Sequence, residues 1–152
     1  MKKILLTIGI LMLTTVAASA QDKKKQRPIA ISQILEADAK KNLNVAWQYF
    51  KLRKAYRAVL MRTEEIIAAH PRFSKIDEVL YLTGMSSHYL SIGKGKQKAT
   101  YPGMSKEEKL RFGKNRLEED AIAFLGMLVE EHPKSKYRKK AAKVLAKIQP
   151  KK

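Results

Sequence analysis

Apolar residues recur at helical spacing along most of the chain, and the clearest stripe lies in a segment, 44–69, that contains neither Gly nor Pro. The members of this stripe, seven positions apart, are Val45, Leu52, Val59 and Ile66. Apolar positions with this period line the face of an α-helix that packs on a core. The segment therefore predicts one long helix, or two helices joined by a slight break near residues 51–54.

Helix ends are marked by the residues that favour them. His70-Pro71 and His132-Pro133 each predict the end of a helix, because proline disfavours helical backbone at the residue before it. Ser105 with Glu108 has the spacing of a capping box, and Ser74 with Asp77 resembles one. Ser135 is the expected cap of the last helix.

The resulting elements are all helical. The predicted helices cover residues 29–41, 44–69, 74–92, 105–131 and 135–148, with a possible break in the fourth at Phe112-Gly113. No run of residues alternates with period two between turns, so no strand is expected. The sequence predicts an all-α fold of about five helices in antiparallel pairs.

The first twenty residues have the organisation of a signal peptide. Met1-Lys2-Lys3 precedes an apolar run from Ile4 to Ala17, and Ala18-Ser19-Ala20 offers a small-residue cleavage site. The apolar run is shorter than the roughly 20 residues of a membrane-spanning helix. We expect cleavage after Ala20 and a periplasmic or secreted protein without a transmembrane helix; the alternative is an uncleaved amphipathic anchor. No cysteine follows the apolar run, so a lipoprotein is not expected.

The rest of the chain suits one domain. Residues 21–28 are basic and almost free of apolar side chains, which predicts a disordered tail. Residues 29–149 form the expected helical domain, and 150–152 form a short tail.

The positive net charge of the chain indicates which classes of partner it can bind. The chain has 32 Lys and Arg against 14 Asp and Glu, a formal net charge of +18. Such a protein favours anionic surfaces. Export argues against nucleic acid and favours anionic lipid, lipopolysaccharide, an acidic cell-wall polymer or an acidic protein; the alternative is that most lysines form a solvated shell. The absence of cysteine excludes disulfides and thiolate zinc sites.

Residues 64–75 and 126–136 echo one another. Each segment ends a helix with His-Pro and then places a serine, Ser74 or Ser135, before the next helix. The two histidines are 62 positions apart (132 − 70), close to two units of a 34-residue helix–turn–helix repeat. The alternative is a chance agreement between two ordinary helix ends.

These residues carry a resemblance to a known family. The segment 124–148 resembles the tetratricopeptide-like repeats of the BamD (YfiO) family, and 55–90 matches more weakly. The matching positions are Tyr56, Ile66, Ile67, His70, Pro71, Ser74 and Tyr81 in the first segment, and Leu128, Val129, His132, Pro133, Ser135, Tyr137, Ala141 and Leu145 in the second. The match covers about two thirds of residues 21–152.

The resemblance implies two tetratricopeptide-like repeats with the 29–41 helix as a cap. Family members of this type act in outer-membrane β-barrel assembly, so the resemblance implies a non-enzymatic adaptor that binds envelope or outer-membrane proteins. This chain departs from the family in lacking the lipoprotein cysteine and in having about two repeats where members usually have more.

No constellation of residues predicts catalysis. His70, His88 and His132 show no ligand spacing, and the adjacent carboxylates, such as Asp77-Glu78, point to different faces of a helix. The glycines and lysines of 93–98 lack the spacing of a phosphate loop. We therefore expect no catalytic residue, no cofactor and no metal.

Candidate binding residues come instead from aromatic and basic side chains. The candidates for contact with a partner are Tyr49, Arg53, Tyr56, Arg57, Lys94, Lys96 and Lys98. The alternative for the aromatic residues, including Trp47 and Phe50, is packing in the core. Two hypotheses remain: an exported adaptor that binds envelope proteins, or a basic helical protein that binds anionic lipid, lipopolysaccharide or cell-wall polymer.

Overall fold

The computed structural model describes residues 19–149, with side chains from Ile31 onward, and the described part is entirely helical. Its elements are α2 (Ser19–Gln48), a π-helical turn η1 (Tyr49–Arg53), α3 (Tyr56–Ala69), α4 (Ile76–Ser91), α5 (Lys106–Arg111), α6 (Lys114–Glu131) and α7 (Arg138–Ile148). The prediction of an all-α fold is confirmed. Most of the expected signal peptide and the tail 150–152 lie outside the described residues.

The chain forms two units, Met1–Leu35 and Glu36–Lys152. In the first unit the described backbone is helical, and the side chains of Ile31, Ile34 and Leu35 are exposed. The second unit holds the hydrophobic core. No helix among the described residues is long and apolar enough to cross a membrane.

Helix α2 differs from the prediction at two places. Residues 21–28, expected to be disordered, are helical, in keeping with the good helix propensity of Lys and Gln. The helix also continues past Lys41-Asn42, where an end was expected. Ala39, Leu43 and Ala46 are all fully buried at helical spacing, so packing on one side carries the helix across this point.

Residues 44–69 form two helices, but the chain reverses direction at the break after Lys54, where only a slight break was expected. Helices α2 and α3 therefore run antiparallel, with His70 beside Asp38 and Ser74 bonded to Glu36.

The π-helical turn η1 ends at Lys54, which adopts a left-handed backbone with φ of 50° and donates its N–H to the Tyr49 carbonyl. The loop after α4 packs on this break: the Lys96 N–H donates to the Lys54 carbonyl at 3.1 Å. Gly95 is required there, since its φ is +108° and a Cβ would lie 2.7 Å from the Lys54 oxygen.

The two His-Pro segments form the same turn. His70 ends α3 and His132 ends α6, and each donates its N–H to the carbonyl four residues earlier. Residues three positions later, Phe73 and Ser135, return a hydrogen bond of 3.0 Å to the carbonyls of these histidines. The helices that follow begin at Ile76 and Arg138. The echo in the sequence therefore corresponds to a repeated helix–turn–helix.

Two details of that echo were predicted wrongly. Neither Ser74 nor Ser135 caps a helix, because the residues at the caps are Lys75 and Tyr137, which make no side-chain capping bond. The spacing of 62 does not represent two 34-residue units. Between the two turns lie α4, a long loop, the short α5 and α6.

The predictions for the α5 region are confirmed. Ser105 and Glu108 form a reciprocal capping box at the start of α5, with bonds of 3.1 and 3.0 Å. The predicted helix 105–131 is interrupted at Phe112-Gly113, and α6 begins at Lys114. The buried Met104 and Phe112 hold this segment against Tyr56 and Leu117.

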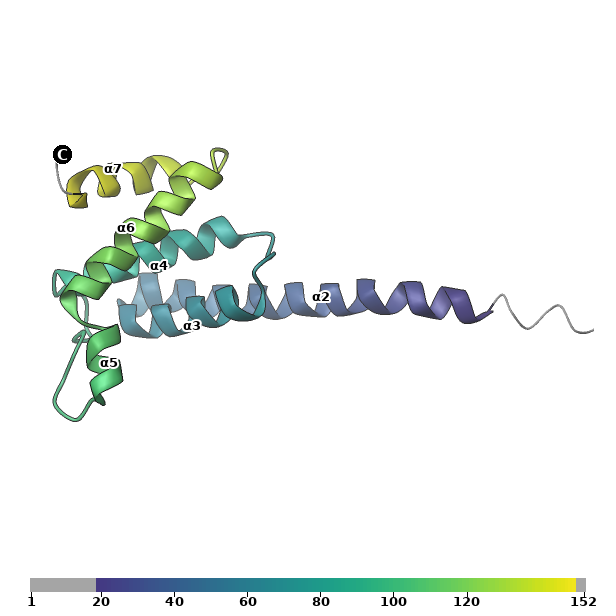
Figure 1. Ribbon diagram of the computed structural model, residues 1–152, viewed down its shortest axis with the longest axis horizontal. Helices are drawn as coiled ribbons and strands as arrows, with labels where there is room; N and C mark the ends of the chain where they lie inside the picture. Colours follow the sequence, from purple (N-terminus) through teal and green to yellow (C-terminus); the bar gives the residue numbers. More distant parts are fainter. Residues whose placement is uncertain (1–18, 150–152) are drawn as a thin grey trace, which may run out of the picture. The chain divides into compact units, whose positions relative to one another are not determined.

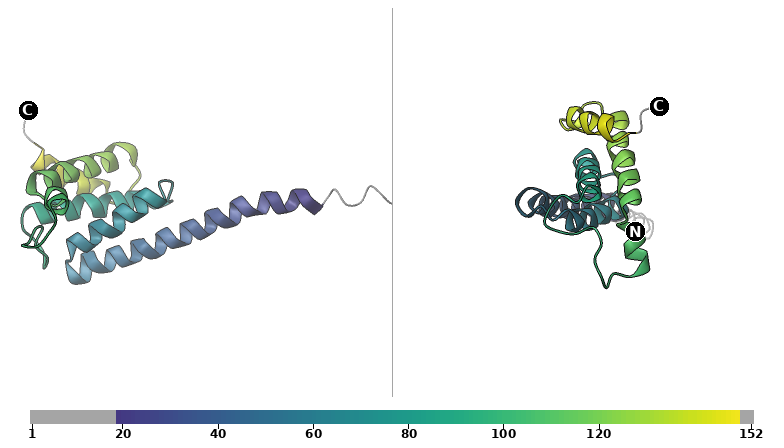
Figure 2. Two further views of the ribbon diagram at one scale, coloured as in Figure 1. Left: turned by 60° about the horizontal axis from the view of Figure 1, so that its bottom comes forward. Right: turned by 90° about the vertical axis from the view of Figure 1, so that its left-hand side faces the viewer.

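Helix α4 is the centre of the second unit. It packs against α3 on one side and α6 on the other, and α7 packs on α6 (Figures 1 and 2). Every residue from Val79 to Ser87 is buried. A helix surrounded in this way is apolar all round, and its polar residues are small: Thr83, for example, donates its hydroxyl to the Val79 carbonyl at 2.8 Å.

Gly84 sets how closely α4 and α6 approach. A Cβ at Gly84 would lie 2.6 Å from Cγ of Leu125, a fully buried residue of α6, and 3.1 Å from its backbone nitrogen. Real Cβ atoms do not approach so closely. The contact between the two helices therefore depends on a position without a side chain.

We expect Gly84→Ala to destabilise the protein by about 1–3 kcal/mol, because the added methyl overpacks the α4–α6 contact. Gly126→Ala is the matched control: that glycine is also helical, and its Cβ would meet nothing within 4 Å. Urea unfolding, followed by the fluorescence of Trp47, measures both. The control should gain up to about 1 kcal/mol from helix propensity, and equal effects at the two positions would contradict the packing argument.

Candidate functional site

Six aromatic rings from different helices form one continuous cluster, which we call the aromatic face. Its members are Trp47, Phe50, Tyr56, Tyr81, Tyr89 and Tyr137. They come from α2, η1, α3, α4 and the residue before α7. Tyr56 and Tyr81 are buried and form the floor, whereas the other four rings are partly exposed.

The rings contact one another in a series that runs from Tyr137 to Tyr89. Tyr137 stacks on Tyr81 with centroids 4.6 Å apart and lies 5.6 Å from Trp47. Trp47 meets Phe50 edge to face at 5.8 Å, and Phe50 stacks on Tyr89 at 6.0 Å. These distances are those of favourable aromatic pairs, each worth about 0.5–1.5 kcal/mol beyond the area it buries.

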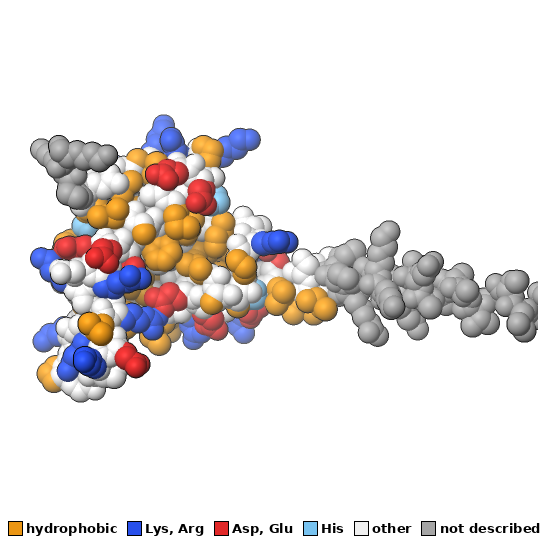
Figure 3. Space-filling view, in the orientation of Figure 1, with side chains coloured by type: hydrophobic (Ala, Val, Ile, Leu, Met, Phe, Trp, Pro, Cys, Tyr) orange, Lys and Arg blue, Asp and Glu red, His pale blue; other side chains and the backbone are white. Residues whose placement is uncertain are grey.

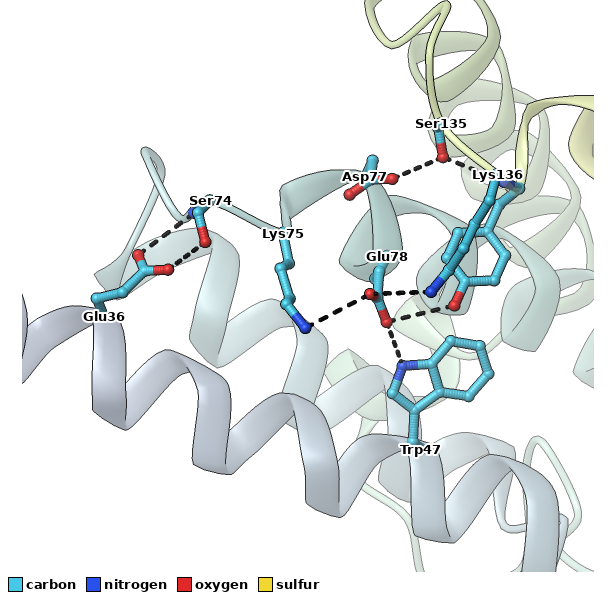
Figure 4. A network of polar contacts seen from close by, with 9 residues as sticks. Glu36, Trp47, Ser74, Lys75, Asp77, Glu78, Ser135 and Lys136 are labelled. Atoms are coloured by element: carbon cyan, nitrogen blue, oxygen red, sulfur yellow. Dashed lines mark hydrogen bonds and ion pairs between the residues drawn. The ribbon is translucent and has the colours of Figure 1, made fainter.

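Glu78 holds one end of the aromatic face together. Its carboxylate accepts a hydrogen bond of 2.8 Å from Nε1 of Trp47 and one of 3.3 Å from the Tyr137 hydroxyl (Figure 4). It also pairs with Lys75 at 3.8 Å and Lys136 at 3.5 Å, and only 13% of its side chain is exposed. Glu78 lies in the first turn of α4, where the helix dipole favours a negative charge. One carboxylate therefore joins α2, α4 and the start of α7.

Further polar contacts fix the turns around it. The Ser135 hydroxyl donates to Asp77 at 2.6 Å and accepts the Tyr137 N–H at 3.2 Å, which ties the α6–α7 turn to α4 (Figure 4). On the other side, Ser74 donates its N–H and its hydroxyl to the two oxygens of Glu36. The serines of the echo thus link helices instead of capping them.

His70 makes a similar link. Its Nε2 lies 3.2 Å from the Asp38 carboxylate on α2, and its side chain is 8% exposed. The equivalent His132 lies partly exposed beside a shallow hollow that Asp77, Pro133 and Ser135 also line. The repeat signature therefore positions α2 and α7 against the turns, and carries no cluster of ligands.

The phenols of Tyr56, Tyr81 and Tyr137 stay neutral at neutral pH, because burial raises the pKa of each. Burial raises the pKa of Tyr81, and the neighbouring Tyr89 and Tyr137 raise it further. Burial likewise raises the pKa of Tyr137. The hydrogen bond to Tyr137 and the charge of Glu78 raise the pKa of Lys136, which keeps its ammonium charged. Tyr137 therefore remains a donor to Glu78.

Basic side chains lie over the partly exposed rings. The ammonium of Lys51 is 4.5 Å from the Trp47 ring centroid, that of Lys94 is 4.6 Å from Tyr89, and that of Lys136 is 4.9 Å from Tyr137. Arg53 lies 5.7 Å from the ring of Tyr49. These are cation–π distances. All four basic residues are exposed.

The residues predicted for binding are divided among several places. Lys94 lies over Tyr89 of the aromatic face, whereas Tyr56, 4% exposed, supports the face from below and does not reach a partner. Tyr49, with Arg53 over its ring, packs on the core cluster between α2 and α3. Arg57 belongs elsewhere, since it stacks on Tyr101 at 4.9 Å and lies 5.8 Å from the Phe112 ring. Lys96 and Lys98 are exposed in the loop after α4.

Sequence reasoning missed Glu78, Tyr81 and Lys136 as members of this face. Asp77-Glu78 was interpreted as charge at a helix start, which is correct for the dipole but overlooks the bonds to Trp47 and Tyr137. A signal was present: Glu78, Tyr81 and Tyr89 lie at spacings of three and eight, which place them on one face of α4.

Other chemistry is sparse in the described part of the chain. Between residues 19 and 149 no group of three or more His, Cys, Asp or Glu side chains could hold a metal ion. His88 lies in a small hollow with Ser91 and Glu118, and burial together with Lys94 lowers its pKa. The aromatic face is therefore the strongest candidate for function.

Comparison with known proteins assigns the chain to no family. No protein-family model, curated protein or solved structure matches the chain. A functional conclusion must therefore rest on the residues of the aromatic face and on the sequence features that accompany it.

We expect Glu78→Ala to destabilise the protein by about 1–3 kcal/mol, because it leaves the Trp47 N–H and the Tyr137 hydroxyl without their shared acceptor. Glu119→Ala is the control, since that side chain is 71% exposed and meets only Arg116 at 3.9 Å. Such surface changes stay within about 0.5 kcal/mol. The emission maximum of Trp47, the single tryptophan, should also shift to the red in Glu78→Ala alone. An unchanged spectrum and stability would contradict the role given to Glu78.

A second prediction concerns pH. The pKa of His88 lies below its ordinary value in the folded protein, so the unfolded chain binds more protons as the pH falls through about 6.5. His88 therefore makes the folded state less stable at pH 5 than at pH 7. Urea unfolding at the two pH values should show a smaller loss for His88→Gln than for the wild type. An equal or larger loss in the variant would refute this assignment.

Proposed function

We propose that the protein is an exported, non-enzymatic adaptor that binds another envelope protein through its aromatic face. The observation that carries this proposal is the set of partly exposed rings of Trp47, Phe50, Tyr89 and Tyr137 on separate elements. Tyrosine and tryptophan are enriched where proteins bind one another, because each offers a large rigid surface with a polar edge.

The rigidity of the face supports this function. Glu78 holds Trp47 and Tyr137 in place, and Ser135 fixes the turn that carries Tyr137. A surface whose side chains are already ordered loses less conformational entropy on binding than a mobile one. The face is therefore suited to recognition.

Two features of the sequence favour a compartment and a class of partner for this adaptor. The charged start, apolar run and small-residue site of residues 1–20 favour export. The resemblance to the BamD family favours a tetratricopeptide-like adaptor, and makes proteins of outer-membrane assembly the expected partners. The repeated turn at His70 and His132 is compatible with such a repeat.

A second candidate function is binding to an anionic surface. Lys and Arg side chains gather over α7 and around α5, on either side of a region of hydrophobic side chains between α6 and α3 (Figure 3). The exposed basic residues of α7 include Lys139, Lys140, Lys143 and Lys147. Binding of this kind would weaken steeply with salt, since the Debye length is only about 8 Å at physiological ionic strength.

Site-specific photocrosslinking in intact cells tests the adaptor. A photoreactive amino acid in place of Lys51 or Lys136 should capture a discrete protein, because these residues lie over the partly exposed rings. Control positions are Met61 on α3 and Glu119 on α6, which are exposed and make no contact with the aromatic face. The full-length gene is expressed from its native locus.

A protein captured from Lys51 and Lys136 but not from the controls would support the adaptor, and its identity would test the link to outer-membrane assembly. Equal capture at all four positions would instead indicate adhesion driven by charge. Capture of no protein at any position, with the protein recovered on anionic lipid or cell-wall material, would favour the second candidate.

A further inference from the structure

The basic residues over the aromatic face are placed to recognise opposite charge. Among the described residues, neither Lys51 nor Lys94 forms a salt bridge, and Lys136 shares Glu78 with Lys75. Asp77 and Glu78, the nearby carboxylates of α4, are already engaged by Ser135, Trp47 and Tyr137. The face therefore presents ammonium groups without an equal number of free carboxylates.

The rings beneath these ammonium groups provide the second half of the site. An exposed cation–π contact is worth only about 0.5–1 kcal/mol, and a lysine stem is flexible. A carboxylate from a partner can draw Lys51 or Lys94 off its ring and form a charge-assisted hydrogen bond. The same movement uncovers the face of Trp47 or Tyr89 for an apolar side chain. One lysine thus connects recognition of charge with access to the ring beneath it.

The rings form a compact patch. Tyr137, Trp47, Phe50 and Tyr89 follow one another at centroid distances of 5.6, 5.8 and 6.0 Å. Tyr81 lies within 6.5 Å of the first three of these rings, so the path through them bends at Trp47. Lysines and rings alternate over this patch, which suits a short segment in which acidic and apolar side chains also alternate.

We propose that the aromatic face binds an acidic segment of a partner protein, with apolar or aromatic side chains on the rings and carboxylates paired with Lys51, Lys94 and Lys136. This proposal rests on the proposed adaptor function and specifies the chemistry of the partner. It also explains why Lys51 and Lys94 lie over rings and not beside the protein's own acids.

Fluorescence anisotropy of labelled peptides tests it. The probe alternates Glu and Phe over eight residues, and the purified protein is otherwise unmodified. Matched peptides replace every Phe with Ala, replace every Glu with Lys, or keep the composition but place all Glu before all Phe. Only the alternating peptide should bind well, and its binding should change the fluorescence of Trp47.

Two triple variants with the same change in net charge make the test specific. Lys51→Gln, Lys94→Gln and Lys136→Gln together should weaken binding of the alternating peptide about tenfold or more. Lys106→Gln, Lys109→Gln and Lys114→Gln, all exposed on α5 and at the start of α6, should change it by less than about twofold. Circular dichroism and urea unfolding confirm that both variants fold.

The outcomes separate the two levels of the proposal. Equal weakening in both triple variants, or equal binding of the block peptide, would overturn the site and indicate general attraction of charge. If the first triple variant loses binding to vesicles of phosphatidylglycerol but the peptide never binds, the surface recognises lipid. If no peptide binds while Lys51 and Lys136 still capture a discrete protein in cells, the acidic ligand is wrong and the adaptor stands.

Discussion

The burial of α4 on every side is the constraint on which the second unit depends. A helix with no solvent face must find partners all round it, and α3 and α6 are two of these partners. Close approach requires Gly84, whose missing side chain makes room for Leu125. Because α4 is fixed in this way, the residues at its two ends, Glu78 and Tyr89, are held where they can organise the aromatic face.

The aromatic face shows how a structural role and a binding role can share the same residues. Tyr56 and Tyr81 belong to the core, and the rings above them extend that core to the surface. The negative charge of Glu78 lies in this apolar region, where two hydrogen bonds and two lysines stabilise it. The side chains of the aromatic face are therefore held in place by the core beneath them. This fixed arrangement is the physical basis for expecting the face to select a partner.

Local patterns predicted most of the helices, because seven-residue periodicity, proline and a capping box act within a few residues. The ends at His70 and His132 and the breaks near Lys54 and Gly113 illustrate this. The roles of the serines could not be predicted in the same way. The hydroxyl of Ser74 donates to Glu36 and that of Ser135 to Asp77, residues that are 38 and 58 positions away. These distant bonds take the place of the helix caps that the local sequence predicts. The aromatic face combines both cases: its residue types were recognised, but Glu78 and Lys136 join it only through the tertiary fold.

The loop after α4 contains one more contact with a wider consequence. The side-chain oxygen of Gln97 accepts the backbone N–H of Ala58 at 3.2 Å, in the first turn of α3, where Ala55 makes no side-chain cap. A helix usually satisfies its first N–H groups with a neighbouring residue, whereas α3 obtains this acceptor from a residue 39 positions later. Together with the bond from Lys96 to Lys54, this contact links the first turn of α3 to the loop after α4. The stability of the break near Lys54 therefore depends on a loop that lies far from it in the sequence.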